Sequence, residues 1–545
     1  MLTGYRAWLW LILLCAALYL PGIASMPAMD RDESRFMQAS RQMAQTGDVI
    51  RIRFLDEARN KKPAGIHWMQ ASTVTALSSP ESTALWPYRV PSVLGALVAV
   101  LFTFALGLLF LDRRGAFLAA ALLASSFLLV FEAHVAKTDA ALLAAIMAAQ
   151  YALAKVYLEW LSGGVAGWRP ALLFWTALAV GIMIKGPIPA IVVFLTLAAL
   201  AVTDRRTRFW DGLRPMVGVP LLLTIAVPWY LAIILADDTF IREAAGRDFF
   251  GKLLTGQEQH WGPPGAYTLL LLATFAPASL LVWPALRWSW IWRREAMVKF
   301  CLCWALPFWL ALELTPTKLP HYILPIYPAL ALLIAMAVQA AEAGEFRWLR
   351  HWATRLFYIA CLLIFGGFTV GMFLLPIITG DGFVGVGLIP IFAFLAVSAY
   401  TVPCLWRGEI RKALLVSAFA TPLVFAPVYS AVAPAVSTIW MSREIGAKVQ
   451  ALDLPTDVKL YATGYTEPSL AFYLGSRLML LSPWQIGNAL PKKGWLAVVG
   501  HTALPEFRTA MSKRGVTLKS VGTIFGFNYS RGRQAAVTLY RPAAD

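Results

Sequence analysis

The chain has 545 residues, of which 59% are hydrophobic and only 14% are charged, and its mean hydropathy is +0.64. Apolar residues in this proportion, gathered in long runs, exclude a single soluble domain and predict a polytopic membrane protein. The net charge of +17 does not indicate nucleic-acid binding, because most lysines and arginines lie in short clusters between apolar runs, as in inner-membrane proteins.

About thirteen apolar segments are long enough, or nearly so, to cross a bilayer, which requires roughly 20 residues. Because many segments follow the first one, we expect the first to stay as a membrane anchor and not to be a cleaved signal peptide. The segments lie at about 8–25, 90–111, 116–131, 139–158, 171–185, 187–203, 215–236, 268–286, 299–314, 323–341, 356–378, 385–405 and 413–435. Residues 1–436 are therefore predicted to form a helical membrane domain.

The loops between these segments alternate in basic charge. One set carries clusters such as Arg113-Arg114, Arg205-Arg206 and Arg293-Arg294, so these loops and the N-terminus are predicted to be cytoplasmic. An odd number of spans then places the C-terminus in the periplasm. The other set of loops would face the periplasm as well.

The first periplasmic loop, predicted at 26–89, is long and highly charged. Asp30 to Arg35 contains three acids and two arginines within six residues. Apolar positions from Asp32 to Met43 have helical spacing, which predicts an amphipathic helix on the membrane surface, and a second interfacial helix is expected from Ile66. Between them lies a basic connector, from Arg51 to Lys62. Positive charge on the periplasmic side indicates a site for anionic phosphates.

The composition changes from about Ser437, where Pro, Gly and polar residues increase and the apolar spans end. Strands are expected at 458–463, 495–499, 521–529 and 535–540, and helices at 467–474 and 504–514. Residues 437–545 should therefore form a small α/β periplasmic domain. We find no glycine fingerprint of a nucleotide-phosphate site there.

The predicted periplasmic loops contribute ionisable side chains that could meet at one site. Such groups are costly to desolvate at a membrane boundary, so they tend to line water-filled cavities. Carboxylates and cations together suit attack by an activated oxygen on a phosphate-bearing donor. A carboxylate would accept the proton, and cations would stabilise the leaving phosphate. The candidates are Asp32, Glu33, Arg35, Lys62, Asp139, Lys185, His260, Lys318 and Tyr322.

Most candidates also have a purely structural interpretation. Asp32 and Asp139 could cap helices, and Lys185 could snorkel from a hairpin turn. Lys62 could bind lipid head groups without specificity. Interfacial anchoring would account for two more, Lys318 and Tyr322.

A metal site is only weakly indicated. Glu258 and His260 could supply two ligands, but two ligands are fewer than a protein metal site normally has. We therefore predict no metal site and no certain cofactor, with a divalent cation as the open alternative. His260 could equally be an ordinary loop histidine.

The predicted loops contain an ordered set of short motifs. The motifs are Asp32-Glu33-Ser34-Arg35-Phe36, Ser40-Arg41-x-Met43, Gly47-Asp48, Lys62-Pro63-x-Gly65-x-x-Trp68, Asp139, Lys185-Gly186, Gln259-His260 and Lys318-Leu319-Pro320-x-Tyr322-Ile323-Leu324. In this order they resemble the motifs of the lipid A aminoarabinose transferases. This family belongs to the wider GT-C group of membrane glycosyltransferases, which includes protein O-mannosyltransferases. The resemblance extends over nearly the whole chain and is sharpest in the loops.

The resemblance implies an inverting glycosyltransferase of the bacterial inner membrane. It would take a sugar from a polyprenyl-phosphate carrier and transfer it to lipid A or another periplasmic glycolipid or polysaccharide. Asp32 would be the leading catalytic carboxylate and Asp139 the second. The residues around the phosphates would be Arg35, Lys62, Lys185 and Lys318, and those of the substrate pocket Glu33, Tyr322 and His260.

Three positions depart from the family pattern. Lys61 stands where the family tends to have Glu, Phe36 stands where Tyr is usual, and Gly65 falls one place early. The extra lysine disfavours a cationic amino sugar and favours a neutral or acidic one. The sequence leaves the sugar and the acceptor open.

Three alternative functions remain at this stage. A protein O-glycosyltransferase of the same architecture would differ only in its acceptor. A flippase or transporter of lipid-linked sugars would usually show internal repeats and ionisable residues at the membrane midplane, which we do not find. A non-catalytic scaffold would not need acids and lysines that converge from separate loops.

Overall fold

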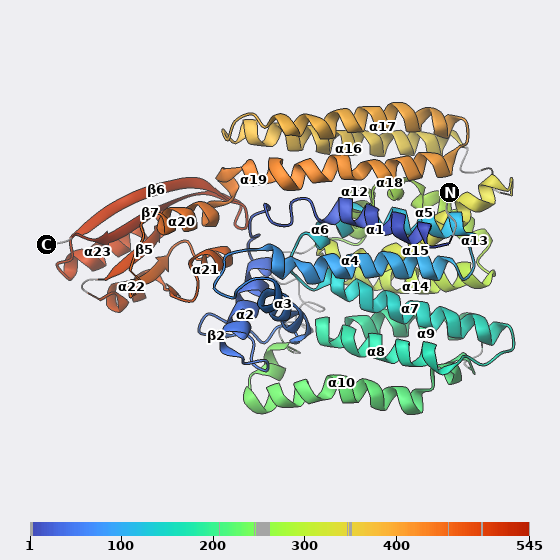
Figure 1. Ribbon diagram of the computed structural model, residues 1–545, viewed down its shortest axis with the longest axis horizontal. Helices are drawn as coiled ribbons and strands as arrows, with labels where there is room; N and C mark the ends of the chain where they lie inside the picture. The colour runs from blue at the N-terminus through green and yellow to red at the C-terminus, as the bar shows by residue number, and fades with distance from the viewer. Residues whose placement is uncertain are drawn as a thin grey trace.

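The computed structural model describes residues 4–205, 208–244, 246, 262–345, 347, 351–455, 457–491 and 494–543. Long helices lie side by side in one bundle, and a mixed α/β domain is attached at one end (Figure 1). This arrangement is the predicted fold class, a polytopic helical membrane protein with a small C-terminal α/β domain.

Each of the thirteen predicted apolar segments contains helix, but fewer than thirteen are long enough to span a membrane. Within the described residues, nine helical segments are long and apolar enough to cross a membrane, or ten if α5 and α6, bent by 60°, form one span. Two more apolar helices, α1 and α9, are shorter. The segment 268–286 is divided between α12 and α13, with Pro277 between the two helices and Pro284 within α13. The bundle helices are α1 (Arg6–Tyr19), α4 (Trp86–Gly107), α5 (Arg113–Ala124), α6 (Phe127–Ala133), α7 (Asp139–Leu161), α8 (Trp168–Lys185), α9 (Ile188–Asp204), α10 (Pro215–Ala236), α12 (Ala266–Thr274), α13 (Val282–Ile291), α14 (Ala296–Leu314), α15 (Tyr327–Glu342), α16 (Trp352–Ile378), α17 (Leu388–Trp406), α18 (Ile410–Pro427) and α19 (Ala433–Ala435).

Small residues allow the central helices to approach closely. The span that contains α15 is 94% buried, whereas those of α10, α16 and α17, at the edges of the bundle, are only 17–22% buried (Figure 1). A Cβ atom at Gly95 of α4 would lie only 2.6 Å from the backbone nitrogen of Ala141 in α7. Close contact of this kind favours helix association in lipid, where burial of apolar surface contributes little.

Both helices that were predicted in the loop 26–89 are present, and their interfacial location stays a prediction. They are α2 (Asp32–Thr46) and α3 (Gly65–Leu77), joined through a short hairpin of β1 (Arg53–Phe54) and β2 (Glu57–Ala58). Both helices lie at the end of the bundle that carries the C-terminal domain (Figure 1). Helix α3 packs on α4 and α8, and α2 packs on α21 of the C-terminal domain.

The C-terminal domain is built on one five-stranded sheet of order β4-β3-β5-β7-β6. Strand β3 pairs in parallel with β4 and β5, and β7 pairs antiparallel with β5 and β6. All four predicted strands and both predicted helices are confirmed. Three elements were not predicted: the very short strand β4, the helix α22, which begins with a proline, and the amphipathic helix α20. The elements are α20 (Met441–Gln450), β3 (Lys459–Thr463), α21 (Pro468–Leu474), β4 (Leu478–Leu480), α22 (Pro483–Ala489), β5 (Trp495–Gly500), α23 (Leu504–Lys513), β6 (Leu518–Asn528) and β7 (Arg533–Pro542).

Candidate active site

The N-terminal end of α7 and the C-terminal end of α8 bring a carboxylate and an ammonium group together. Asp139 is the first residue of α7 and Lys185 is the last residue of α8. Each charge has the sign that the adjacent helix dipole favours. Lys185 Nζ lies 2.5 Å from Asp139 Oδ1, and both side chains are buried. The pair is therefore fixed by the packing of α7 against α8.

Lys137 and Glu132 extend this ion pair into a network. Lys137 Nζ lies 2.9 Å from Glu132 Oε1 and 3.9 Å from Asp139 Oδ2. Burial lowers the pKa of Lys137, but the two carboxylates outweigh this effect, so its pKa is raised above the usual value. Lys137 is therefore a cation at neutral pH, and Asp139 faces two ammonium groups.

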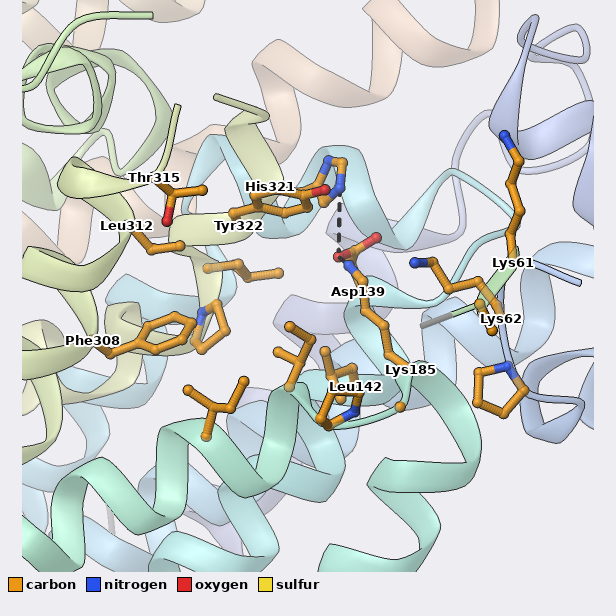
Figure 2. Close-up of a pocket in the computed structure, with 18 of the residues that line it drawn as sticks. Lys61, Lys62, Asp139, Leu142, Lys185, Phe308, Leu312, Thr315, His321 and Tyr322 are labelled. Atoms are coloured by element: carbon orange, nitrogen blue, oxygen red, sulfur yellow. Dashed lines mark hydrogen bonds and ion pairs between the residues drawn. The ribbon is translucent and has the colours of Figure 1, made fainter. Parts of the chain in front are cut away.

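His321 also joins the network, and its surroundings fix its tautomer. Its Nδ1 lies 3.3 Å from Lys137 Nζ, which can only donate, so Nδ1 accepts. The proton of the neutral ring is then on Nε2, which lies 3.9 Å from Asp139 Oδ1. Figure 2 shows the imidazole directed at this carboxylate.

An apolar cavity of about 430 Å³ opens beside Asp139. Its walls come from α7, α8, α9, α10, α14 and the turn before α15, and Figure 2 shows apolar side chains such as Leu142 and Phe308 around it. The charged residues Lys62, Lys185 and Asp139 lie together at one side of it. Lys185 Nζ lies 5.3 Å from the centre of the Tyr322 ring, a cation–π contact.

A second, smaller cavity of about 90 Å³ is lined mainly by polar and charged residues. Asp32, at the start of α2, lines it and is exposed. Arg31, Arg35 and Arg59 line it from the same loop. The two cavities share the six residues Lys61, Lys62, Asp139, Lys185, His321 and Tyr322. An apolar chamber therefore adjoins a charged one.

Six predicted site residues meet at these cavities: Asp32, Arg35, Lys62, Asp139, Lys185 and Tyr322. Five further basic residues there were not named as site residues: Arg31, Arg59, Lys61, Lys137 and His321. Glu132 was not named either; it lines neither cavity and joins the site through its ion pair with Lys137. Glu132, Lys137 and Asp139 lie close together in sequence, and this spacing was a usable signal. His321 stands beside Tyr322 in the Lys318–Leu324 motif, and Lys61 beside Lys62, so adjacency to motif residues could have identified both.

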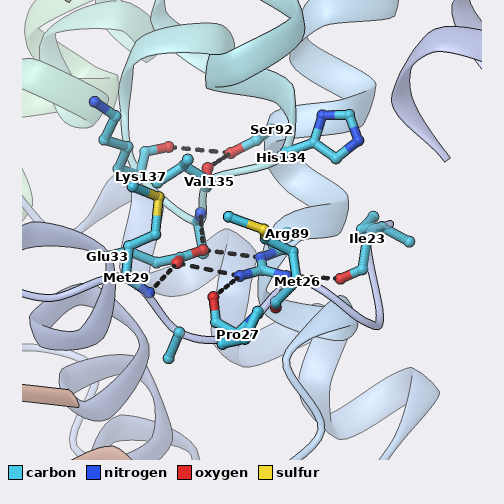
Figure 3. Close-up of polar contacts among 12 residues, drawn as sticks. Ile23, Met26, Pro27, Met29, Glu33, Arg89, Ser92, His134, Val135 and Lys137 are labelled. Carbon is cyan, nitrogen blue, oxygen red and sulfur yellow. Dashed lines mark hydrogen bonds and ion pairs between the residues drawn. The ribbon is translucent and has the colours of Figure 1, made fainter. Parts of the chain in front are cut away.

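Glu33 occupies a different position from the predicted one. Its carboxylate is fully buried against Arg89, and it lines neither of these two cavities among the described residues (Figure 3). Glu33 also accepts hydrogen bonds from the backbone N–H groups of Met29 and Ala136, both at 2.8 Å. Through these contacts Glu33 holds the loop against α4 and the segment before α7.

Lys318 also differs from the prediction. Its ammonium group donates to the carbonyls of Leu312 and Glu313 at 2.7 and 2.8 Å, at the C-terminal end of α14. In this position it satisfies the last carbonyls of the helix. Lys318 lines neither of the two cavities described above. Its predicted phosphate contact therefore has no support in this arrangement.

The remaining two predicted residues, Glu258 and His260, lie outside the described residues. Among the residues that are described, no group of three or more His, Cys, Asp and Glu side chains could hold a metal ion.

Residues 27–236 match the family model of dolichyl-phosphate-mannose-protein mannosyltransferase. This match confirms the family resemblance. The chain is also 27% identical over 346 residues to an undecaprenyl phosphate-alpha-4-amino-4-deoxy-L-arabinose arabinosyl transferase of Pseudomonas aeruginosa, covering 62% of this chain and 61% of that protein. A protein of the same description from Pseudomonas fluorescens is 28% identical over 355 residues, with 63% and 62% covered. The chain thus matches about three fifths of the length of these relatives.

The fold is that of a solved membrane protein. The crystal structure of ArnT from Cupriavidus metallidurans bound to undecaprenyl phosphate superposes with a TM-score of 0.75 and covers 97% of both chains, at 17% sequence identity. The helical bundle and the C-terminal domain are both included in this coverage. At such low identity the likeness establishes the architecture of the chain.

Proposed function

We propose that the protein is an inverting glycosyltransferase of the bacterial inner membrane, with its site facing the periplasm. It would transfer a sugar from a polyprenyl-phosphate donor to lipid A or another glycolipid or polysaccharide. One observation carries this proposal: the apolar cavity of about 430 Å³ and the charged cavity of about 90 Å³ share six lining residues. A lipid-linked sugar phosphate has the same division, since its chain is apolar and its head group is polar.

The cations at the boundary would hold the phosphate. Lys62 and Lys185 line both cavities, and Arg35 lines the charged one. When the bond between the sugar and the phosphate oxygen breaks, the electron pair stays on that oxygen, and ordered cations stabilise the charge. Because Asp139 contacts Lys185 at 2.5 Å, we assign it the role of positioning this ammonium group.

Asp32 is the better base of the two carboxylates. It is exposed in the charged cavity, whereas Asp139 is buried among Lys185, Lys137 and His321. The acceptor hydroxyl would attack the anomeric carbon on the face opposite the phosphate and transfer its proton to Asp32. Attack from the opposite face inverts the configuration at that carbon. General base catalysis of this kind contributes roughly 10²–10⁴-fold to the rate.

The sugar and the acceptor each have two candidates. The relatives are named for an aminopentose, but Lys61 adds positive charge at the boundary of the cavities, which favours a neutral or acidic sugar. A protein acceptor is the second candidate, because the matching family model describes protein mannosyltransferases.

The test is mass spectrometry of lipid A, total glycolipids and cell-envelope proteins from cells with the wild-type protein, Asp32→Asn or no protein. The matched control is Asp56→Asn, because Asp56 is an exposed carboxylate of the same loop outside both cavities. We expect a mass increment with wild type and Asp56→Asn that is lost with Asp32→Asn. The size of the increment identifies the sugar class, and its carrier identifies the acceptor. An increment that survives Asp32→Asn would show that Asp32 is not the base.

A further inference from the structure

The residues directly before Asp32 are held by the C-terminal domain. The backbone N–H of Asp30 donates to the Tyr529 hydroxyl at 2.6 Å, and the Arg31 guanidinium donates to the Ser530 carbonyl at 2.5 Å. Both contacts join residues that are 499 positions apart in the sequence. They therefore connect the turn between β6 and β7 to the first residues of the proposed active-site loop.

The Asp30 side chain is the end of a directed hydrogen-bond chain. Asp30 Oδ1 accepts from the backbone N–H of Ser469 at 3.2 Å and from the hydroxyl of the same serine. Because the Ser469 hydroxyl has one proton, its contact with Ser442, at 2.6 Å, must be donated by Ser442. Ser442 in turn accepts from Tyr465 at 3.0 Å. Hydrogen bonds in such a chain polarise and strengthen one another.

Glu467 fixes the turn from which Tyr529 projects. Its carboxylate accepts hydrogen bonds from Asn528 at 2.8 Å, from the Ser530 hydroxyl at 2.8 Å and from Arg531 at 2.9 Å. The carboxylate is buried, so these bonds are shielded from water. The turn is therefore a rigid support for the contacts to Asp30 and Arg31.

The start of α2 is held locally by bonds of Met29 with Glu33 and Ser34, but not by a side-chain cap. Arg31 is the N-cap residue of α2, and its side chain makes no capping hydrogen bond. Its φ of 66° lies in the left-handed region, which is uncommon for a residue with a side chain. The contact of its side chain with the Ser530 carbonyl ties this residue to the C-terminal domain. Arg31 and Asp32 both line the charged cavity of about 90 Å³.

We propose that the C-terminal domain positions Asp32 and Arg31 for the transfer step, through the contacts of Asp30 with Ser469 and Tyr529. Asp30, Ser469 and Tyr529 are then positioning residues, and the C-terminal domain takes part in the chemical step. This inference rests on the proposed function, because it concerns the base assigned there. A catalytic group misplaced by about 1 Å can lower a rate roughly 100-fold.

Two conservative variants test the inference. Tyr529→Phe keeps the ring and removes the oxygen that accepts from Asp30, and Asp30→Asn removes the charge at the end of the chain. The matched control is Tyr540→Phe, because the Tyr540 hydroxyl contacts Arg508 within the same domain and lies outside the two cavities of the proposed site. Each full-length variant is compared with wild type at equal expression.

Three measurements are made on each variant: the glycosylated fraction of the product in cells, hydrogen exchange of residues 28–36 in the purified protein, and binding of undecaprenyl phosphate. We expect Tyr529→Phe and Asp30→Asn to lower product formation at least about tenfold, because the base moves. Exchange at 28–36 should increase, and exchange of the buried helix α15 should not. Binding of undecaprenyl phosphate should change less than about threefold, because Lys62 and Lys185 remain in place.

The outcomes separate this inference from the proposed function. Wild-type product formation by both variants would overturn the positioning role, and so would a loss of product with unchanged exchange at 28–36. A loss of product that Tyr540→Phe shares would mean that the domain is sensitive to any lost hydroxyl, which also overturns it. The absence of product from the wild-type protein would instead overturn the proposed function, while the exchange data would still report on the contacts of Asp30.

Discussion

Glu33 and Arg89 form an ion pair in which both side chains are completely buried, with Arg89 Nε 2.9 Å from Glu33 Oε1 (Figure 3). The pair connects α2 to α4 at the end of the bundle that holds both cavities. Its other polar atoms bond to backbone groups of Ile23, Met26, Pro27, Met29 and Ala136. Asp32 is the immediate neighbour of Glu33, so this pair helps to fix the active-site loop.

We predict that Arg89→Met strongly destabilises the protein. The substitution leaves the Glu33 carboxylate buried without its cation, which costs about 3–5 kcal/mol of unfolding free energy. Thermal unfolding of the purified protein in detergent measures the effect. The control is Arg51→Met, because Arg51 forms a half-exposed pair with Asp48 that should contribute at most about 1 kcal/mol. Equal melting temperatures for the two variants would contradict the structural role of Arg89.

Two of the three lysines predicted to bind phosphate, Lys185 and Lys318, should respond differently to substitution. Lys185→Met removes a cation that lines both cavities, so we expect product formation to fall roughly 10–100-fold, the equivalent of one charged hydrogen bond. Lys318→Met removes a cap of α14, so we expect a lower melting temperature with product formation within about threefold of wild type. Assays of product in cells and thermal unfolding measure the two effects. A larger loss of product with Lys318→Met would return this lysine to the site.

The sequence was most informative where a residue's position on an element determines its neighbours. Asp139 and Lys185 were predicted to meet at one site because both lie in loops assigned to the periplasmic side, and the structure places them 2.5 Å apart. Asp32, Arg35 and Lys62 were predicted from charge within one loop, and all three line the charged cavity. Motif order and segment boundaries therefore sufficed for this part of the site.

The direction of a side chain was the information that the sequence lacked. Glu33 follows Asp32 in the chain, yet successive helix positions point about 100° apart, so one residue lines the cavity and the other pairs with Arg89. The role of Asp30 depends on Ser469, 439 positions away, and no local pattern reports such a contact. The boundaries of the apolar segments likewise could not indicate that α12 and α13 are too short to span.

Blocking the apolar cavity should weaken use of a long lipid donor. Ala311 on α14 lines this cavity, and Ala311→Trp would fill part of its volume of about 430 Å³. We expect binding of undecaprenyl phosphate to weaken at least about tenfold, because burial of the chain contributes about 0.8 kcal/mol for each CH₂ group that is excluded. Titration of the purified protein with undecaprenyl phosphate and with a short-chain isoprenyl phosphate measures the effect.

The short-chain lipid serves as an internal control, because its binding depends mainly on the phosphate and should change little. Ala396→Trp is the matched control variant, since Ala396 is an exposed residue of α17 outside this cavity. Equal weakening for both lipids would mean that the substitution disturbs the phosphate site. No weakening for the long lipid would show that its chain lies elsewhere.

The stability of the contact between the loop and the C-terminal domain should depend on pH through Asp30. Burial raises the pKa of Asp30 to about 6; hydrogen bonds from Ser469 and the charge of Arg31 lower it, and the neighbouring Glu467 raises it further. An unfolded aspartate has a pKa of about 3.9. Between these two values the folded protein holds a proton that the unfolded chain has lost. The contribution of Asp30 to the unfolding free energy therefore decreases as the pH rises from about 4 to about 6.

Asp30→Asn removes this titration and provides the measurement. We expect the unfolding free energy of wild type minus that of Asp30→Asn to decrease by up to about 3 kcal/mol between pH 4 and pH 6, and to be constant above pH 7. Melting temperatures in detergent, recorded for both proteins across this range, give the difference. Asp381→Asn is a suitable control. Burial raises the pKa of Asp381, but hydrogen bonds from Ser437 and Thr379 outweigh this effect and lower it, so its contribution changes below about pH 4 and should be nearly constant between pH 4 and pH 6. Parallel curves for wild type and Asp30→Asn would mean that Asp30 does not titrate in this range, and the buried environment assigned to it would be wrong.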